Sequence, residues 1–124
     1  MEEHKEPISI DVLINDIKAY SPTADIALIR RAYELAEKAH SGQRRVSGEA
    51  YIIHPLHVAK VLTDLHMDDA TVSAALLHDV VEDTIYTNEE MQQMFGEEIA
   101  MLIDGVTKLG RIQYMSKEDV HLEN

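Results

Sequence analysis

One stretch near the middle of the chain, residues 74–84 (AALLHDVVEDT), restricts the possible fold more than any other. Pairs of apolar residues alternate there with pairs of polar residues, which is the pattern of an α-helix and not of a strand. At roughly 100° per residue, one face of this helix carries Leu76, Leu77, Val80 and Val81. The other face carries an imidazole and several carboxylates: His78, Asp79, Glu82 and Asp83. We therefore expect an amphipathic helix with a compact polar patch.

Two interpretations of this polar patch are open. Neighbouring carboxylates repel one another unless a positive charge lies among them, and a divalent cation would supply that charge. An adjacent His and Asp, as in His78-Asp79, are suitable mixed nitrogen and oxygen ligands for such an ion. The alternative is an ordinary acidic helix face exposed to solvent, and this stretch alone does not decide between them.

The rest of the chain predicts further helices and no strand, so the expected fold class is all-α. Helix-spaced apolar residues and N-cap signals place the segments at about 9–20, 24–40, 54–66, 68–84, 87–96, 97–110 and 117–124. The second segment takes its cap signal from Ser21-Pro22-Thr23, and the fourth from Asp68 or Asp69. Thr87 and Glu90 form a capping-box signature. The buried side of the third segment is expected to contain Leu56, Ala59, Val61 and Leu62.

Composition narrows the class of protein. A chain of 124 residues suits a single domain, and a formal net charge of -12 argues against binding nucleic acid. The absence of Cys excludes disulfides and thiolate ligands. No secretory signal pattern and no apolar run of membrane-spanning length occurs in the sequence, so we expect a cytoplasmic protein that does not contact a membrane.

A glycine-rich basic segment, residues 41–50 (SGQRRVSGEA), stands out in so acidic a chain. It is either a plain connecting loop or an anion-binding loop, in which glycine frees backbone N–H groups and Arg44 and Arg45 offer guanidinium groups. His54-Pro55 follows this segment and opens the third helix, where Pro55 loses no hydrogen bond. His54 at the helix entrance is free to face either way, whereas His57 and His66 are expected to be surface or packing residues.

Four segments in order resemble the RelA/SpoT-type HD domain: His40–Pro55, Ala74–Thr84, Thr87–Gly96 and Asp104–Leu109. The resemblance covers about residues 26–124 and implies a bundle of six or seven helices. It implies hydrolysis of the 3′-pyrophosphate of the alarmones pppGpp and ppGpp (guanosine penta- and tetraphosphate), which gives GTP or GDP. The implied cofactor is Mn²⁺, held by His54, His78 and Asp79. Glu82 and Asp83 are the implied catalytic pair, and Arg44, Arg45 and Ser47 the implied substrate-binding residues.

The resemblance also leads to expectations about the rest of the domain and of the protein. The family's fourth metal ligand lies in a later motif, so we expect residues 1–124 to be an incomplete HD hydrolase domain that lacks its last helices. Such a chain should bind Mn²⁺ weakly or not at all, hydrolyse ppGpp slowly or not at all, and expose a groove through which it could self-associate. The Asp104–Leu109 segment resembles the long stringent-response enzymes, so synthetase (GTP pyrophosphokinase) and regulatory domains are expected to follow. The alternative function is a non-catalytic nucleotide-binding regulatory HD domain.

Overall fold

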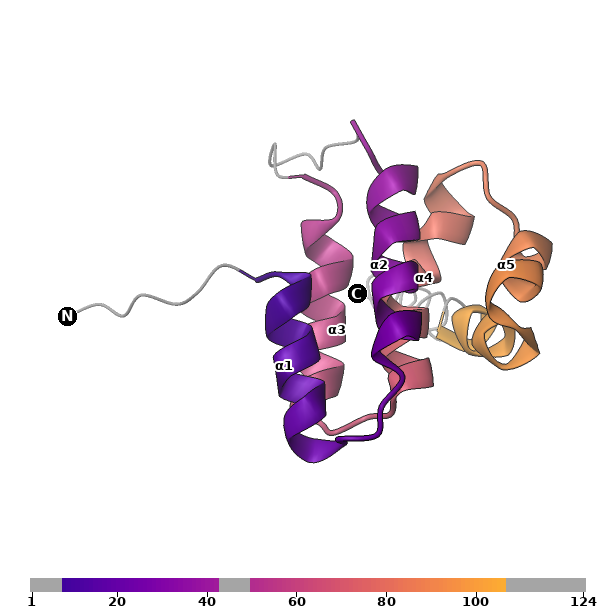
Figure 1. The fold of residues 1–124 in the computed structure, drawn as a ribbon. Coiled ribbons are helices and arrows are strands. Elements are labelled where there is room, and N and C mark those ends of the chain that lie inside the picture. The colour runs from indigo at the N-terminus through magenta and orange to yellow at the C-terminus, as the bar shows by residue number, and fades with distance from the viewer. Residues whose placement is uncertain (1–7, 43–49, 107–124) are drawn as a thin grey trace, which may run out of the picture.

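The computed structural model describes residues 8–42 and 50–106 of the chain (Figure 1). Within these ranges the chain is helical and contains no strand, which confirms the all-α fold class. The helices are α1 (Ile10–Tyr20), α2 (Ile26–Ala39), α3 (Ile53–Asp64), α4 (Asp69–Asp83) and α5 (Asn88–Phe95). The chain is helical again over residues 97–106, where its description ends. The predicted helix end at Gly110 and the predicted helix 117–124 lie outside the described residues.

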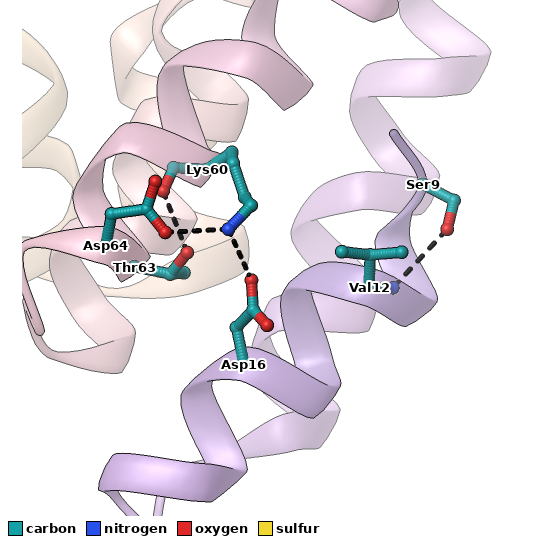
Figure 2. Close-up of polar contacts among 6 residues, drawn as sticks. All are labelled: Ser9, Val12, Asp16, Lys60, Thr63 and Asp64. Atoms are coloured by element: carbon teal, nitrogen blue, oxygen red, sulfur yellow. Dashed lines mark hydrogen bonds and ion pairs between the residues drawn. The ribbon is translucent and has the colours of Figure 1, made fainter. Parts of the chain in front are cut away.

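Side-chain caps begin three of the helices, and two of these caps, at Asp68 and Thr87, are predicted by the sequence. The Ser9 hydroxyl accepts a hydrogen bond from the Val12 backbone N–H at 3.3 Å and opens α1 (Figure 2). The Asp68 carboxylate accepts one from the Thr71 N–H at 2.9 Å and opens α4. A complete capping box at Thr87 opens α5. Each cap satisfies an N–H group that has no partner inside its own helix.

The predicted start of α2 is wrong by two residues. Asp25, and not the Ser21-Pro22-Thr23 segment, caps this helix by accepting from the Leu28 N–H at 3.0 Å. The reason lies elsewhere in the chain, because the Asp25 N–H itself donates to the Asp69 carboxylate at 2.6 Å. This long-range bond ties the turn before α2 to the start of α4.

Helix α4 is the centre of the molecule and packs against both α2 and α3. Helix α1 packs against α3 and α2, while α5 and the segment 97–106 lie on the side of α4 away from α1 (Figure 1). The buried core joins all of these elements through side chains such as Ile17, Ile29, Leu76, Met91 and Ile103. No helix within the described part of the chain is both long and apolar enough to span a membrane.

The alternative of an acidic helix face exposed to solvent does not hold for most of the length of α4. Residues 72–77 are all buried, Asp79 is only 8% exposed, and the exposed polar residues begin at Glu82 and Asp83. The sequence pattern describes one helix by itself, whereas α2 and α3 together enclose α4 on more than one side. Asp79 is therefore a buried carboxylate and not part of a solvated acidic face.

A second correction concerns the buried side of α3. Val61 was expected to be buried and is 56% exposed, whereas Thr63 is only 2% exposed. The Thr63 hydroxyl donates to the Lys60 carbonyl at 2.9 Å, so this polar group is satisfied inside the helix (Figure 2). Because its hydroxyl is satisfied, Thr63 can be buried without a large desolvation cost.

An ion-pair cluster fixes α3 against α1. Lys60 Nζ on α3 lies 2.8 Å from an Asp16 carboxylate oxygen on α1 and 2.6 Å from Asp64 on its own helix (Figure 2). The two carboxylates, Asp16 first, raise the pKa of Lys60 above its usual value. This cluster joins the two helices and so helps to set the position of α3, which carries His54.

Candidate metal centre

Helix α3 carries His54 in its first turn. Its backbone N–H donates to the Tyr51 carbonyl at 3.2 Å, and the following Pro55 is buried. Leu56 and Ala59, both almost fully buried, hold this part of the helix in the core. Because α3 packs along α4, its first turn brings the His54 ring beside His78 and Asp79.

The three side chains converge, as the sequence predicts. One ligand atom from each of His54, His78 and Asp79 lies within 4.8 Å of the other two. The Asp79 carboxylate oxygens lie 3.2 Å from His78 Nε2 and 3.6 Å from His54 Nε2. The two imidazole rings are 6.0 Å apart between centroids and tilted by 58°. Metal–ligand bonds of about 2.0–2.3 Å fit such a cluster with small side-chain adjustments.

The hydrogen bond made by His78 determines which of its nitrogens faces the cluster. Its Nδ1 lies 2.7 Å from the Ala75 carbonyl oxygen, which can only accept. Nδ1 must therefore carry a proton, and in the neutral ring Nε2 presents a lone pair to Asp79. A backbone carbonyl that orients an imidazole in this way is typical of metal-binding histidines.

Asp79 contributes a buried oxygen that is unsatisfied within the described part of the chain. Its Oδ2 accepts no hydrogen bond from the described residues, and its distance of 3.6 Å from His54 Nε2 is too long for one. Leaving a buried carboxylate oxygen in this state is costly. A divalent cation between this oxygen and the two imidazole nitrogens would satisfy all three groups, so the residues present fit a metal.

Of the three side chains of the cluster, that of His54 is the most exposed to solvent. The side chain of His54 is 38% exposed, whereas those of His78 and Asp79 are 14% and 11% exposed. A closed structural site surrounds its ion completely, whereas a catalytic site keeps positions for water and substrate. The partial exposure of His54 is compatible with the second kind of site.

The predicted catalytic pair lies one turn further along α4. Glu82 and Asp83 are both exposed, and Glu82 is not a member of the converging group. The Asp83 carboxylate accepts a hydrogen bond of 2.5 Å from the Tyr51 hydroxyl. Their assignment as catalytic residues stays a prediction, as does the assignment of the three ligands.

The predicted substrate-binding residues Arg44, Arg45 and Ser47 lie outside the described residues. The two histidines expected to play no part in the site do lie elsewhere. His57 is exposed on α3, and His66 stacks on the Tyr20 ring with centroids 4.4 Å apart. Both are thus surface or packing residues, as the sequence predicts.

Tyr51 is the residue that reasoning from the sequence did not single out. It lies inside the segment that resembles the family's first motif, but nothing in its spacing connects it to Asp83. The signal available was its position three residues before His54, which places it at the entrance of the same helix. The contact itself depends on how α3 and α4 pack.

Comparison with known proteins places this chain among HD domains. The family model described as "HD domain" matches residues 32–124. The chain is 46% identical over 112 residues to the GTP pyrophosphokinase rsh of Brucella ovis, covering 90% of this chain and 15% of that protein. It is 44% identical over 111 residues to the GTP pyrophosphokinase of Myxococcus xanthus, covering 87% and 15%.

A third relative has a name that includes hydrolysis. The chain is 45% identical over 108 residues to the bifunctional (p)ppGpp synthase/hydrolase SpoT of Escherichia coli, covering 87% of this chain and 15% of that protein. The chain thus spans about a seventh of the length of each of these relatives. These matches concern the segment that contains the converging His54, His78 and Asp79.

Proposed function

Because this chain belongs to the HD domain family, in its RelA/SpoT-type branch, we propose that it is a metal-dependent phosphohydrolase unit acting on guanosine alarmones. The reaction is removal of the 3′-pyrophosphate from pppGpp or ppGpp, with GTP or GDP as the other product. The observation that carries the proposal is the convergence of His54, His78 and Asp79 around an unsatisfied buried carboxylate oxygen.

In this proposal the three residues hold Mn²⁺. When bound, such an ion supplies Lewis-acid polarisation of a phosphoryl oxygen and lowers the pKa of a coordinated water. Mixed imidazole and carboxylate ligands suit Mn²⁺ among several divalent metals. The Ala75 carbonyl keeps the His78 ring turned so that Nε2 faces Asp79, where it would be able to serve as a ligand.

The remaining roles belong to residues around the cluster. Glu82, one helical turn beyond His78, holds or moves a proton of the attacking water. Asp83 orients that water or the leaving group. Arg44, Arg45 and Ser47 bind the phosphates and the guanosine, since guanidinium groups pair with phosphate oxygens in a bidentate manner. We also propose that the unit works within a longer enzyme with synthetase and regulatory domains, as the lengths of the relatives favour.

The test measures hydrolysis under single-turnover conditions, so that even slow activity is detected. The chain, freed of metal and reloaded with Mn²⁺, is mixed in excess with ppGpp, and pyrophosphate and GDP are followed. We expect GDP formation that EDTA abolishes. Loss of the His54 ligand in His54→Ala should lower Mn²⁺ affinity by at least about tenfold.

His57→Ala is the matched control, because it removes an exposed imidazole from the same helix. It should leave both Mn²⁺ affinity and GDP formation unchanged. If the Mn²⁺-loaded chain binds ppGpp but releases no pyrophosphate, hydrolysis is wrong and the non-catalytic regulatory domain is favoured. Equal Mn²⁺ affinity in the His54 and His57 variants would contradict the ligand assignment.

A further inference from the structure

A tyrosine links the two parts of the site. We infer that Tyr51 is a positioning residue that holds the Asp83 carboxylate in place relative to the metal cluster, an inference that rests on the proposed function. The Tyr51 hydroxyl donates to Asp83 Oδ2 at 2.5 Å, and the Tyr51 carbonyl accepts from the His54 N–H at 3.2 Å. One residue is thus bonded through its side chain to Asp83 and through its backbone to the proposed ligand His54.

The Tyr51 ring is itself held in place by a second ring. It stacks on the His40 ring with centroids 4.6 Å apart and an angle of 19° between the planes. His40 is only 3% exposed, and its backbone N–H donates to the Ala36 carbonyl at 3.0 Å at the end of α2. A buried ring fixed at a helix end provides a rigid surface on which the tyrosine ring can rest.

Asp83 needs such support because of where it lies. It is the last residue of α4 and is exposed, and helix ends fray. The Thr84 hydroxyl and N–H both donate to the Val80 carbonyl, at 2.6 Å and 3.2 Å, and so fix the backbone at this end. The hydrogen bond from Tyr51 then restrains the side chain that the fixed backbone presents.

Asp83 also forms part of a pocket wall, and the bond that it accepts from Tyr51 is charge-assisted. Asp83 lines a pocket of about 460 Å³ together with Lys38 of α2 and Ile85 and Tyr86 after α4. A hydroxyl donating to a carboxylate forms a charge-assisted hydrogen bond, which is stronger than a neutral one.

The first experiment separates positioning from binding. Tyr51→Phe removes the hydroxyl and keeps the ring that stacks on His40. In the Mn²⁺-loaded chain we expect kcat for ppGpp hydrolysis to fall by about ten- to a hundredfold, the range expected for losing a hydrogen bond to a charged group. KM and Mn²⁺ affinity should change by no more than about twofold, because this residue does not touch the substrate in the proposal.

Tyr33→Phe is the matched control. The Tyr33 hydroxyl also donates to a carboxylate, that of Glu37, at 3.3 Å on α2, away from the metal cluster. This variant should leave kcat unchanged. In an Asp83→Asn background, Tyr51→Phe should cause little further loss, because the carboxylate that it positions is no longer present.

The second experiment does not depend on activity. A double-mutant cycle with Tyr51→Phe and Asp83→Asn is followed by denaturant unfolding. We expect a coupling of about three- to tenfold in the unfolding equilibrium constant. A cycle without coupling would overturn the inference whether or not the chain hydrolyses ppGpp.

The remaining outcomes separate the two proposals. Coupling in unfolding together with an unchanged kcat would show that the bond exists but has no positioning role. If the double-mutant cycle shows coupling but the wild-type chain does not hydrolyse ppGpp, the proposed function is overturned, and the catalytic part of this inference with it. A loss that appears in KM alone would place Tyr51 in substrate binding and would also overturn the inference.

Discussion

The buried carboxylate of Asp79 should change its effect on stability when a cation binds. Without metal, its unsatisfied Oδ2 costs about 1–3 kcal/mol, so Asp79→Asn should be at least as stable as the wild type in EDTA. With Mn²⁺ at about a hundred times its dissociation constant, the wild type should gain about 2.7 kcal/mol. Thermal unfolding of both proteins, with Mn²⁺ and with EDTA, measures this reversal.

Asp11→Asn is a suitable control for this reversal. Asp11 pairs with Arg30 at 3.4 Å on the surface, and its side chain is 75% exposed. Its replacement should leave the Mn²⁺-dependent gain intact. An equal gain in the Asp79 variant would mean that the ion binds elsewhere.

Glu82 offers a second prediction at the level of a single residue. Glu82→Gln should keep Mn²⁺ and lower the rate of ppGpp hydrolysis by about 10²–10⁴-fold, because an amide cannot accept a proton from water. Glu98→Gln, at an exposed position outside the site, should have no effect. Rates and bound Mn²⁺ are measured on the same samples, and a Glu82 variant with the wild-type rate would exclude the role of proton acceptor.

At the scale of one helix, the start of α4 should make stability depend on pH. Hydrogen bonds from Thr71 lower the pKa of Asp68 below its ordinary value of 3.8. The stability that this cap contributes is therefore fully present above that value and is lost as the pH falls through the lower, folded pKa. Asp68→Ala should cost about 0.5–2 kcal/mol at pH 7, and the difference from wild type should shrink in acid.

Asp68→Asn separates the charge from the cap. Asparagine caps helices about as well as aspartate, so this variant should be close to wild type at pH 7. Because its amide does not titrate, the acid-dependent loss due to this position should be absent. Urea unfolding of the three proteins between pH 2 and pH 7 measures these differences. If the free energy of unfolding falls in parallel with pH in all three proteins, the role of Asp68 is contradicted.

At the scale of the whole molecule, the interior of α4 should dominate stability. Leu76 is completely buried at the centre of the bundle, whereas Leu65 after α3 is 65% exposed. Leu76→Ala should therefore cost about 2–5 kcal/mol, a large part of the total for a domain of this size. Leu65→Ala makes the same chemical change and should cost less than about 0.5 kcal/mol. Chemical unfolding of both variants tests this, and similar losses would contradict the described core.

The sequence predicts those features that depend on neighbouring positions along the chain. The caps at Asp68 and Thr87 and the start of the first helix near Ser9 are local features, and the structure has them where expected. The buried state of Asp79 was not predictable from the pattern of α4, because it depends on how many other helices surround that helix. The spacing of apolar residues along one helix does not show how many other helices pack against it.

The candidate site also combines features that the sequence predicts with one that it does not. His78 and Asp79 are adjacent, and His54 stands at a helix entrance, so their convergence could be predicted with the help of the family resemblance. The bond between Tyr51 and Asp83 joins positions 32 residues apart and exists only after α3 has packed on α4. Contacts of this kind, between residues far apart in the sequence, can be identified only from the three-dimensional structure.

The close packing around α4 means that this helix cannot be rotated about its axis. One residue inserted between Asp68 and His78 would swing the downstream side chains by roughly 100°, carrying Asp79 away from His54 and into contact with leucine and alanine. An insertion after Thr84, where Ile85 is 92% exposed, would leave this angle unchanged. The number of residues that precede His78 in α4 therefore matters to the candidate metal centre as much as the three proposed ligands do, and we expect related chains to vary in length after α4 and not within it.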